Sequence, residues 1–510
     1  MKTHNLFTDS ISIGSFHAVA NGIVVVASAG NSGPYFGTVS NVAPWLFTVA
    51  ASTIDRDFAS YVTLGDNKHF KGTSLSSKDL PTHKFYPLIS GEQGKHFYAL
   101  SRDAKFCRYG TLDVEKVRGK IVVCLEDVYF GTIPGPEASS AGAVGMILAS
   151  DDESYYDFIA YPHALPTSQV NYIDSQYIYS YIKNEKNPVA YITKAITEIP
   201  IIPAPVIASF SSRGPSTIIP SILKPDITAP GVNIIAAYTE INRRISYKSL
   251  SGTSMACPHV SGIAGLLKTL HPKWSPAAIK SAIMTTGTTS INHPTYFNFF
   301  KIITRQLSCF CRASPGAMVR LFPCDLKAAA SKMDNSKRPI KDRFGENATP
   351  FAYGSGHVQP NLAIDPGLIY DLNIVDYLSL LCVYNKNYKQ IEAIYKKPFI
   401  CPESYNVVDL NYPTITILNL GDKIIKVSRT VTNVGPPSTY YVQAKAPDGV
   451  SVSIEPSYLS FKEVGEKKSF KVIVMKAMEN GDATMDYVFG ELLWSNGKHR
   501  VMSTIAVKLK

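Results

Sequence analysis

GTSMACPHVSGIAGLLKTL, residues 252–270, combines a sharp turn with the start of an amphipathic helix. Gly252 permits the turn, because glycine adopts backbone conformations that other residues avoid. Apolar side chains then recur at helical spacing between Met255 and Leu267. Pro258 is expected in the first turn, where its missing N–H costs little. The pattern therefore predicts a helix that begins at the Gly-Thr-Ser turn.

Ser254 is the residue of this stretch that could carry chemistry. Its hydroxyl lies at the positive end of the predicted helix dipole, where a developing negative charge is favoured. A nucleophile at a turn that leads into a helix is a recurring solution for acyl transfer. The same shape also fits a serine that only caps the helix. The local pattern alone leaves both interpretations open.

Two apolar runs near the start of the chain predict the fold class. GIVVVASAGNSGP, residues 22–34, and WLFTVAAS, residues 45–52, read as buried strands, and IGSFHAVANG, residues 13–22, reads as a helix that ends at Gly22. Fully apolar strands combined with a helix are typical of a parallel sheet with both faces covered. Ala27-Ser28-Ala29 imitates a signal-peptide cleavage site, but the apolar run before it is too short.

Five segments, in consistent order, resemble one protein family, the subtilases, and their plant members in particular. Two resemble the oxyanion-hole turn and the nucleophile motif of that family, and three resemble its framework: SAGNSGP (28–34), GTSMACPHVSG (252–262), NVAPWLFTVAAST (41–53), ASFSSRGP (208–215) and KPDITAPGVNI (224–234). The resemblance implies a serine endopeptidase that acts on peptides or proteins without a cofactor. It makes Ser254 the nucleophile and Asn31 the donor to the oxyanion.

The resemblance also divides the chain. A segment between TVAAS and ASFSS is similar to a protease-associated domain, and the alternating short runs from DLNYPTI onward are similar to a fibronectin-III-like β-sandwich. The implied fold is a subtilisin-like parallel sheet with helices on both faces, present only in part, plus these two domains. The expected units are the first part of the catalytic domain (1–60), the inserted domain (61–192), the second part of the catalytic domain (193–375), a connector (376–405) and the sandwich (406–510).

Residues 290–332 fit nothing around them. They have no helix caps and no sustained period, and they hold three of the eight cysteines. A zinc site at Cys309, Cys311 and Cys324 would need a fourth ligand, and Cys-x-Cys spacing favours one only weakly. We expect no metal there, and we interpret the segment as a foreign insertion that takes no part in the fold.

The sequence departs from the family in one respect that bears on activity. The catalytic Asp and His of subtilases lie in Gly-flanked motifs upstream of SAGNSGP, and no Asp-Thr-Gly or His-Gly-Thr-His pattern occurs here. His4 and His17 lack the motif, and His259 is five residues past Ser254 on the same predicted helix. The sequence therefore predicts an inactive piece of a protease, without its signal peptide and propeptide. The alternative is a pseudoprotease that binds peptides without cutting them.

Composition excludes several other classes. No run approaches the roughly 20 apolar residues that span a bilayer, and the net charge of +11 is spread thinly. The densest basic stretches, 386–397 and 338–343, are interrupted by acidic or aromatic residues, which argues against nucleic-acid binding.

Secretion follows from the resemblance and from weaker signals. The family is extracellular, in the apoplast and cell wall, and its inserted domain limits access or supports a homodimer contact. Asn347 begins the sequon Asn-Ala-Thr, and two cysteine pairs, Cys107 with Cys124 and Cys382 with Cys401, each flank a short segment. Disulfides and free buried thiols both remain open for these four residues.

Overall fold

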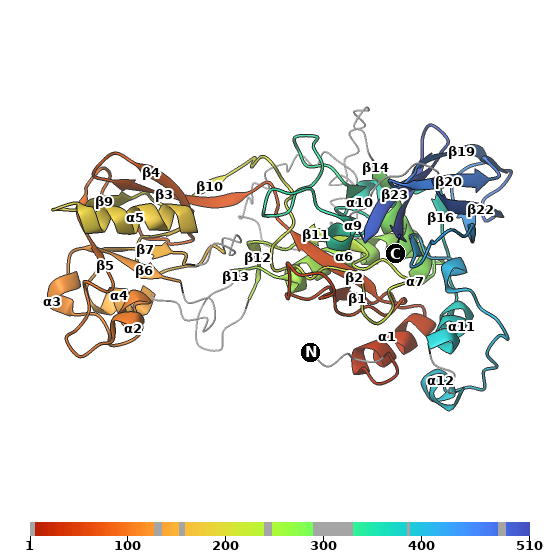
Figure 1. Cartoon of the computed structure of the whole chain (residues 1–510), viewed down its shortest axis with the longest axis horizontal. Coiled ribbons are helices and arrows are strands. Elements are labelled where there is room, and N and C mark those ends of the chain that lie inside the picture. Colours follow the sequence, from red (N-terminus) through yellow and green to blue (C-terminus); the bar gives the residue numbers. More distant parts are fainter. Residues whose placement is uncertain are drawn as a thin grey trace, which may run out of the picture.

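The computed structural model describes residues 6–126, 135–151, 159–238, 247–288, 330–384, 388–477 and 486–509. Figure 1 shows three parts along the longest axis: an inserted lobe at one end, a parallel-sheet core in the middle and a β-sandwich beyond it. Cys309, Cys311 and Cys324, at which we expect no metal, lie outside these ranges, as do all but the last three residues of the segment 290–332.

The parallel-sheet core is built on three strands in the described residues. They pair in parallel in the order β1-β2-β11, with bounds β1 (Val26–Ser28), β2 (Phe47–Ser52) and β11 (Ile227–Pro230). The helices around them are α1 (Ser10–Ala20), α6 (Thr253–Leu270) and α7 (Pro276–Thr285). Helix α6 packs against all three strands, and β2, which lies between the other two, is buried along its whole length. The expected parallel sheet with helices packed against it is therefore present.

Two local expectations for this core are wrong. The strand expected at IVVVASAG, residues 23–30, is only three residues long and partly exposed, because β1 lies at the edge of the described sheet. Ile23, just before it, is 57% exposed. Pro258 lies well beyond the first turn, because α6 already begins at Thr253. It therefore removes a helical hydrogen bond to the carbonyl of Ser254.

Short elements complete the core. They are β12 (Ile234–Ala237), β13 (Tyr247–Leu250), β14 (Gly287–Thr288), β15 (Ala330–Ser331), α9 (Pro350–Tyr353) and α10 (Pro360–Ala363). β15 pairs in parallel with β14, and the next residue, Lys332, is buried with its Nζ 2.8 Å from Glu491 Oε1. Residues 330–332 therefore belong to the fold, and the expected boundary of the foreign segment is wrong at this end.

The inserted lobe extends from β3 to β10. Its strands follow the order β10-β3-β4-β8-β7-β6-β5-β9, and a further pairing of β9 with β3 closes the sheet on itself. The strands are β3 (Asp57–Leu64), β4 (His69–Thr73), β5 (Tyr86–Ser90), β6 (Ile121–Leu125), β7 (Gly145–Ala149), β8 (Thr167–Val170), β9 (Val189–Ile192) and β10 (Ile196–Glu198). The helices are α2 (Ser101–Lys105), α3 (Val114–Val117), α4 (Gly135–Ser140) and α5 (Tyr172–Asn184).

Two features of the inserted lobe lie near the end of β6. Cys107 and Cys124 form a disulfide, with their Cα atoms 5.6 Å apart. Glu126, directly after β6, is buried and accepts a hydrogen bond of 2.7 Å from Gln169 Nε2. Burial raises the pKa of Glu126 to about 7, the hydrogen bond from Gln169 lowers it in part, and the nearby charge of Asp151 raises it further.

The raised pKa of Glu126 predicts that the lobe loses stability as the pH rises from about 4.5 to 7. The folded state holds its proton in this window while the unfolded chain releases it, so higher pH favours unfolding. Glu126→Gln keeps the shape of the side chain without its charge. It should therefore remove this pH-dependent loss in the free energy of unfolding, which is on the order of 2–3 kcal/mol. Amide exchange of β6 and β7 in urea, at pH 5 and pH 8, measures the effect. Glu185→Gln, at an exposed position of the same lobe, is the control. An equal pH dependence in wild type and Glu126→Gln would contradict the prediction.

The β-sandwich has two described sheets. One has the order β16-β18-β22-β20 and the other β17-β24-β23-β19-β21. The strands are β16 (Leu368–Ile369), β17 (Ile415–Ile417), β18 (Ile425–Asn433), β19 (Ser438–Lys445), β20 (Val450–Glu455), β21 (Tyr458–Phe461), β22 (Lys467–Lys476), β23 (Tyr487–Ser495) and β24 (Arg500–Lys508). Every second residue of β23 is buried, as expected for a strand with one face on a core. Trp494 and Phe470 meet edge to face in that core, with ring centroids 5.1 Å apart.

A helical connector leads from the core to the sandwich. It consists of α11 (Ile374–Tyr384), α12 (Tyr388–Tyr395) and η1 (Val407–Asp409). A disulfide between Cys382 in α11 and Cys401 after α12 closes it, with Cα atoms 5.8 Å apart.

A buried ionic cluster joins the core to the sandwich. Asp226, directly before β11, lies 2.7 Å from Lys224 Nζ and 3.1 Å from Lys280 Nζ through its Oδ2, and all three side chains are at most 5% exposed. Tyr412, on the sandwich side, donates to Asp226 Oδ1 and accepts from Lys280. The cluster therefore contains one acidic group, two basic groups and a phenol from distant parts of the chain.

The charges in this cluster shift one another's protonation. Burial by itself raises the pKa of Asp226, but the charges of Lys224 and Lys280 outweigh it, so that this pKa lies below its ordinary value. Burial lowers the pKa of Lys280 well below its ordinary value, and Asp226 offsets this only in part. Burial and the charge of Asp226 together raise the pKa of Tyr412 well above its usual range. Tyr412 therefore remains a neutral phenol that can both donate and accept.

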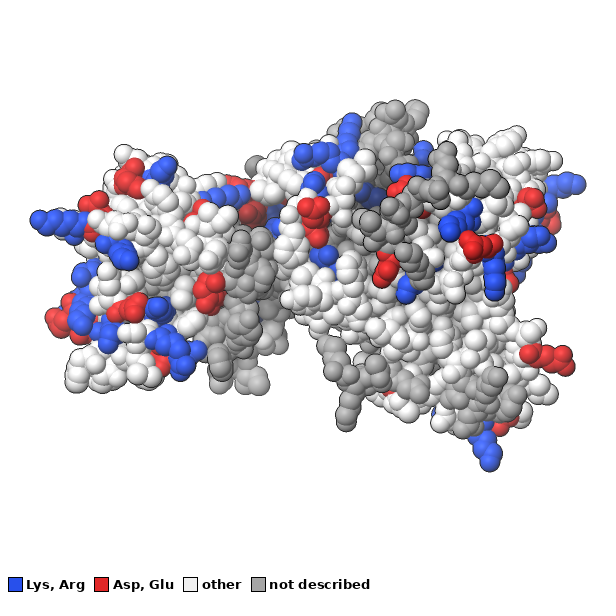
Figure 2. All heavy atoms as spheres, viewed as in Figure 1, with Lys and Arg blue, Asp and Glu red and all other residues white. Residues whose placement is uncertain are grey.

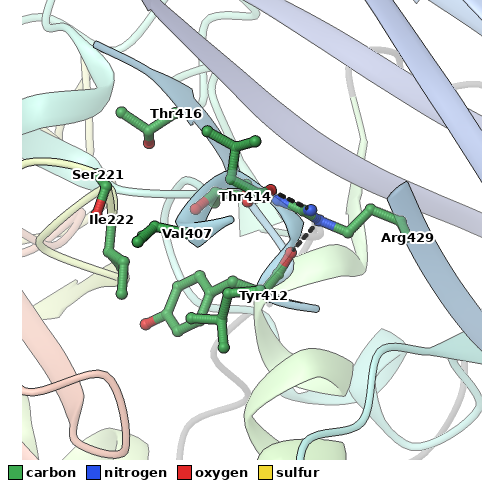
Figure 3. Close-up of a pocket in the computed structure, with 9 residues that line it drawn as sticks. Ser221, Ile222, Val407, Tyr412, Thr414, Thr416 and Arg429 are labelled. Atoms are coloured by element: carbon green, nitrogen blue, oxygen red, sulfur yellow. Dashed lines mark hydrogen bonds between the residues drawn. The ribbon is translucent and has the colours of Figure 1, made fainter. Parts of the chain in front are cut away.

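Arg429 supports the loop that carries Tyr412. Its guanidinium donates to the carbonyls of Tyr412 (3.1 Å), Thr414 (3.2 Å) and Val408 (2.6 Å), and the first two bonds are drawn in Figure 3. The loop lines a cavity of about 10 Å³, into which Thr414 and Thr416 bring hydroxyls with no hydrogen-bond partner among the described residues. A cavity of this size is at the lower limit for one water molecule.

Tyr412→Phe should destabilise the chain by about 1.5–3 kcal/mol, because it removes a hydrogen bond to a buried charged group and leaves Asp226 Oδ1 without that donor. Thermal unfolding measures the loss. Tyr441→Phe, at a position 64% exposed in the same sandwich, should change the melting temperature little. Equal melting temperatures of Tyr412→Phe and wild type would show that the cluster contributes nothing.

Candidate active site

The residues expected to carry chemistry meet at the start of α6. Gly252 precedes the helix with φ 156° and ψ 159°, a conformation that is essentially restricted to glycine. Ser254 is the second residue of the helix, and its side chain is exposed. No described residue hydrogen-bonds its Oγ. A hydroxyl in this position is open to a substrate and lies at the positive end of an 18-residue helix.

Asn31 lies beside this turn. Its Oδ1 accepts hydrogen bonds from the backbone N–H of Thr253 (3.0 Å) and from Thr253 Oγ1 (2.7 Å). Because a backbone N–H can only donate, the accepting atom must be the amide oxygen, and Nδ2 is therefore left free to donate elsewhere. A Cβ built on Gly252 would lie 3.4 Å from that Nδ2. The structure thus brings the amide of Asn31 next to the Ser254 turn.

The turn that carries Asn31 is held by residues 209–212. Ser212 Oγ accepts from Ser32 N at 3.0 Å, and Phe210 O accepts from Gly33 N at 2.8 Å. A Cβ on Gly33 would lie 2.3 Å from the carbonyl oxygen of Ser211, so only glycine fits there. The framework segment ASFSSRGP therefore positions the Asn31 turn, a role that its sequence alone did not indicate.

Thr253 is the functional residue that sequence analysis missed. Besides its two bonds to Asn31, its Oγ1 accepts from Gly30 N at 3.2 Å. It therefore fixes both the amide of Asn31 and the backbone before it. The signal was its place directly before Ser254 in GTS, but the partner is 222 residues away in sequence.

No general base stands at Ser254 in the described part of the chain. His259 turns back along α6, where its Nδ1 lies 2.8 Å from the carbonyl oxygen of Met255. His357 is partly buried, and burial, with the charge of His259, lowers its pKa to about 4. Burial also raises the pKa of the Cys257 thiol, and Ser261 offsets this in part, so that Cys257 is a poor nucleophile. The geometry therefore places an exposed hydroxyl beside an amide that is free to donate, and no proton acceptor lies at that hydroxyl among the described residues.

The remaining expected residues lie elsewhere. Asn347 of the sequon is exposed. The two cysteine pairs lie in the inserted lobe and in the connector. Groups of three or more potential metal ligands are absent from the residues that the structure covers. In those same residues, no helix is both long enough and apolar enough to cross a membrane. On the face shown in Figure 2, basic and acidic side chains are interspersed over all three parts.

Comparison with known proteins places this geometry in a family. The model of the subtilase family matches residues 4–356, and that of a fibronectin type-III domain matches residues 409–507. The subtilisin-like protease SBT5.3 of Arabidopsis thaliana is 47% identical over 99% of this chain and 61% of its own length. The subtilisin-like protease Glyma18g48580 of Glycine max is 46% identical over 100% of this chain and 61% of its own length.

Solved structures add little. A psychrophilic subtilisin-like protease from Pseudoalteromonas sp. AS-11 aligns over 70% of this chain and 67% of its own, with 12% identity and a TM-score of 0.24. A score this low carries no argument, and it is the family match that confirms the expected subtilisin-like fold class. The chain spans about 61% of the length of the relatives named above.

Proposed function

Because the chain belongs to the subtilase family, we propose that it supplies the nucleophile and the oxyanion hole of a serine endopeptidase. The observation that carries the proposal is the exposed Ser254 beside an Asn31 amide whose oxygen is fixed by Thr253. The substrate is a peptide or protein, and no cofactor is needed.

The proposed reaction is acyl transfer. Ser254 Oγ attacks the carbonyl carbon of the scissile peptide bond, and the carbonyl oxygen takes up the negative charge. Asn31 Nδ2 and the backbone N–H of Ser254, in the first turn of α6, donate to that oxygen. The C–N bond then breaks, the amine leaves with a proton, and water hydrolyses the ester on Ser254. Each step needs a base that accepts and returns a proton.

Asn31→Ala and Thr253→Val test the oxyanion hole, in a chain completed with the Asp- and His-bearing segment of a relative. We expect Asn31→Ala to lower kcat by roughly 10²–10³, the range measured for the corresponding change in subtilisin, the archetype of the family. Thr253→Val removes one of two bonds that orient Asn31, so its loss should be smaller and should vanish in the Asn31→Ala background. Ser261→Ala, at an exposed position of the same helix, is the matched control.

Two results would contradict this assignment. A fluorophosphonate reacts with activated serines, so labelling that survives Ser254→Ala would remove Ser254 from the role. Additive losses from Asn31→Ala and Thr253→Val would mean that Thr253 does not act through Asn31.

The second part of the proposal is that residues 1–510 alone do not hydrolyse peptides at an enzymatic rate. No Asp-Thr-Gly or His-Gly-Thr-His motif occurs among them, and a serine without a base is almost never an alkoxide at neutral pH. In subtilisin, loss of the triad costs about 10⁶ in kcat.

Comparison of residues 1–510 with the completed chain measures this second part. Only the completed chain should cleave a peptide substrate, and equal activity of the two would contradict it. The alternative, a pseudoprotease, is favoured by the absence of a histidine contact at Ser254 in the described residues. It predicts that residues 1–510 bind peptides by calorimetry and that Ser254→Ala binds them equally well.

Three further features belong to the same proposal. The inserted lobe is a protease-associated domain that limits access to the site or supports a homodimer contact. The chain acts outside the cell, where its two disulfides persist, and where the exposed Asn347 can carry a glycan. Support for this location comes from the relatives, one of which is named a secreted protease.

A further inference from the structure

Asn233, which lies outside the candidate site, makes hydrogen bonds to three separate segments of the chain. It follows β11, is 5% exposed and has φ 53°. This left-handed conformation is rare for residues other than glycine, and asparagine is among the few that tolerate it. Its N–H points toward one part of the molecule, and its backbone carbonyl and side chain point toward another.

One direction leads to the loop before the nucleophile. The backbone N–H of Asn233 donates to Ser251 Oγ at 2.9 Å, and Gly252 N donates to the carbonyl of Gly231 at 2.8 Å. A Cβ on Gly231 would lie 2.9 Å from the carbonyl oxygen of Gly252, so the two backbones are in close contact. Residues 231–233 therefore form the support on which residues 251 and 252 lie.

The other direction leads to the inserted lobe. Asn233 Oδ1 accepts from the backbone N–H of Ala160 at 2.9 Å, and its carbonyl accepts from Arg56 Nη2 at 2.7 Å. Ala160 is buried, and the carbonyl of the next residue, Tyr161, accepts from Leu75 N at 3.1 Å inside the lobe. Arg56 directly precedes β3, the first strand of the lobe. The lobe is thus hydrogen-bonded to Asn233 from two separate segments.

We propose that Asn233 is a positioning residue that couples the seating of the inserted lobe to the loop that presents Ser254. The coupling runs from Ala160 through Asn233 to Ser251 and, along the backbone, to Thr253, which orients Asn31. A lobe displaced by a ligand or a partner loosens the nucleophile turn, and a seated lobe holds it. The catalytic consequence rests on the proposed function, whereas the physical coupling does not.

Hydrogen exchange of the full 510-residue chain tests the coupling without any activity. Asn233→Gly keeps the positive φ that glycine adopts freely and removes Oδ1. We expect exchange at Ala160, Gly252 and Thr253 to rise together by about tenfold, as for the loss of one buried hydrogen bond. Asn233→Asp retains an oxygen acceptor and should restore protection. Asn67→Gly, at another position with positive φ (65°), should leave all three amides unchanged.

Each outcome decides the proposal. Faster exchange at Ala160 with Gly252 and Thr253 unchanged would overturn it, because the two ends would then be independent. Faster exchange throughout the chain, including the β18–β22 ladder, would also overturn it, because Asn233 would then serve global stability only. Failure of Asn233→Asp to restore protection of Gly252 would exclude the side-chain oxygen as the link.

Kinetics of the completed chain test the catalytic consequence separately. Asn233→Gly should lower kcat by about tenfold with KM unchanged, since the substrate contacts remain and only the nucleophile turn is loosened. A change in KM alone would contradict a positioning role. A completed chain that is inactive even without substitution would refute the proposed function, while the exchange data would still decide the coupling.

Discussion

The architecture depends on how the chain neutralises one buried carboxylate. Asp226 lies in the core with no solvent, and an isolated charge there would cost far more than any single contact returns. Its Oδ2 accepts from the backbone N–H of Thr48 at 2.7 Å and lies close to Lys224 and Lys280. Its Oδ1 receives the hydroxyl of Tyr412. The β-sandwich is therefore part of the electrostatic balance of the core.

The same strands also restrict the backbone conformation around the candidate site. Strands β2 and β11 are adjacent, and Asp226 fixes their register at one end through Thr48. At the other end, the residues that follow β11 contact the backbone of Gly252. The next residue, Thr253, lies close enough to the Asn31 turn to hydrogen-bond its amide oxygen. Glycines at 33 and 231 make these approaches possible, since a Cβ at either position would lie within 3 Å of neighbouring atoms. The geometry of the site is thus a consequence of close backbone packing.

The sequence predicted the features that are local or that belong to long motifs. The helix at Ser254, the parallel strands and the sandwich all follow from patterns of a few residues. The start of α6 was predicted correctly, but Pro258 lies in its second turn and not in its first. Strand β1 was expected to be longer because the sequence cannot show which strand lies at an edge. Lys332 looked like part of an insertion, since its partner Glu491 is 159 residues away.

The Asp226 cluster and the Asn233 link could not be predicted for the same reason. Their partners lie far apart in sequence, and each residue, taken alone, reads as an ordinary polar position in a framework segment. Only the fold brings each residue next to its partners. Asp226 lies directly before β11, and Asn233 lies just beyond its other end. In a parallel sheet the carboxyl end of the strands is the edge that holds the site. The sandwich is therefore attached to the opposite edge, where it can affect stability. The inserted lobe is attached to the edge of the candidate site, where it can affect the turn that carries Ser254. The four residues of β11 thus separate the attachment of the sandwich from the attachment of the inserted lobe.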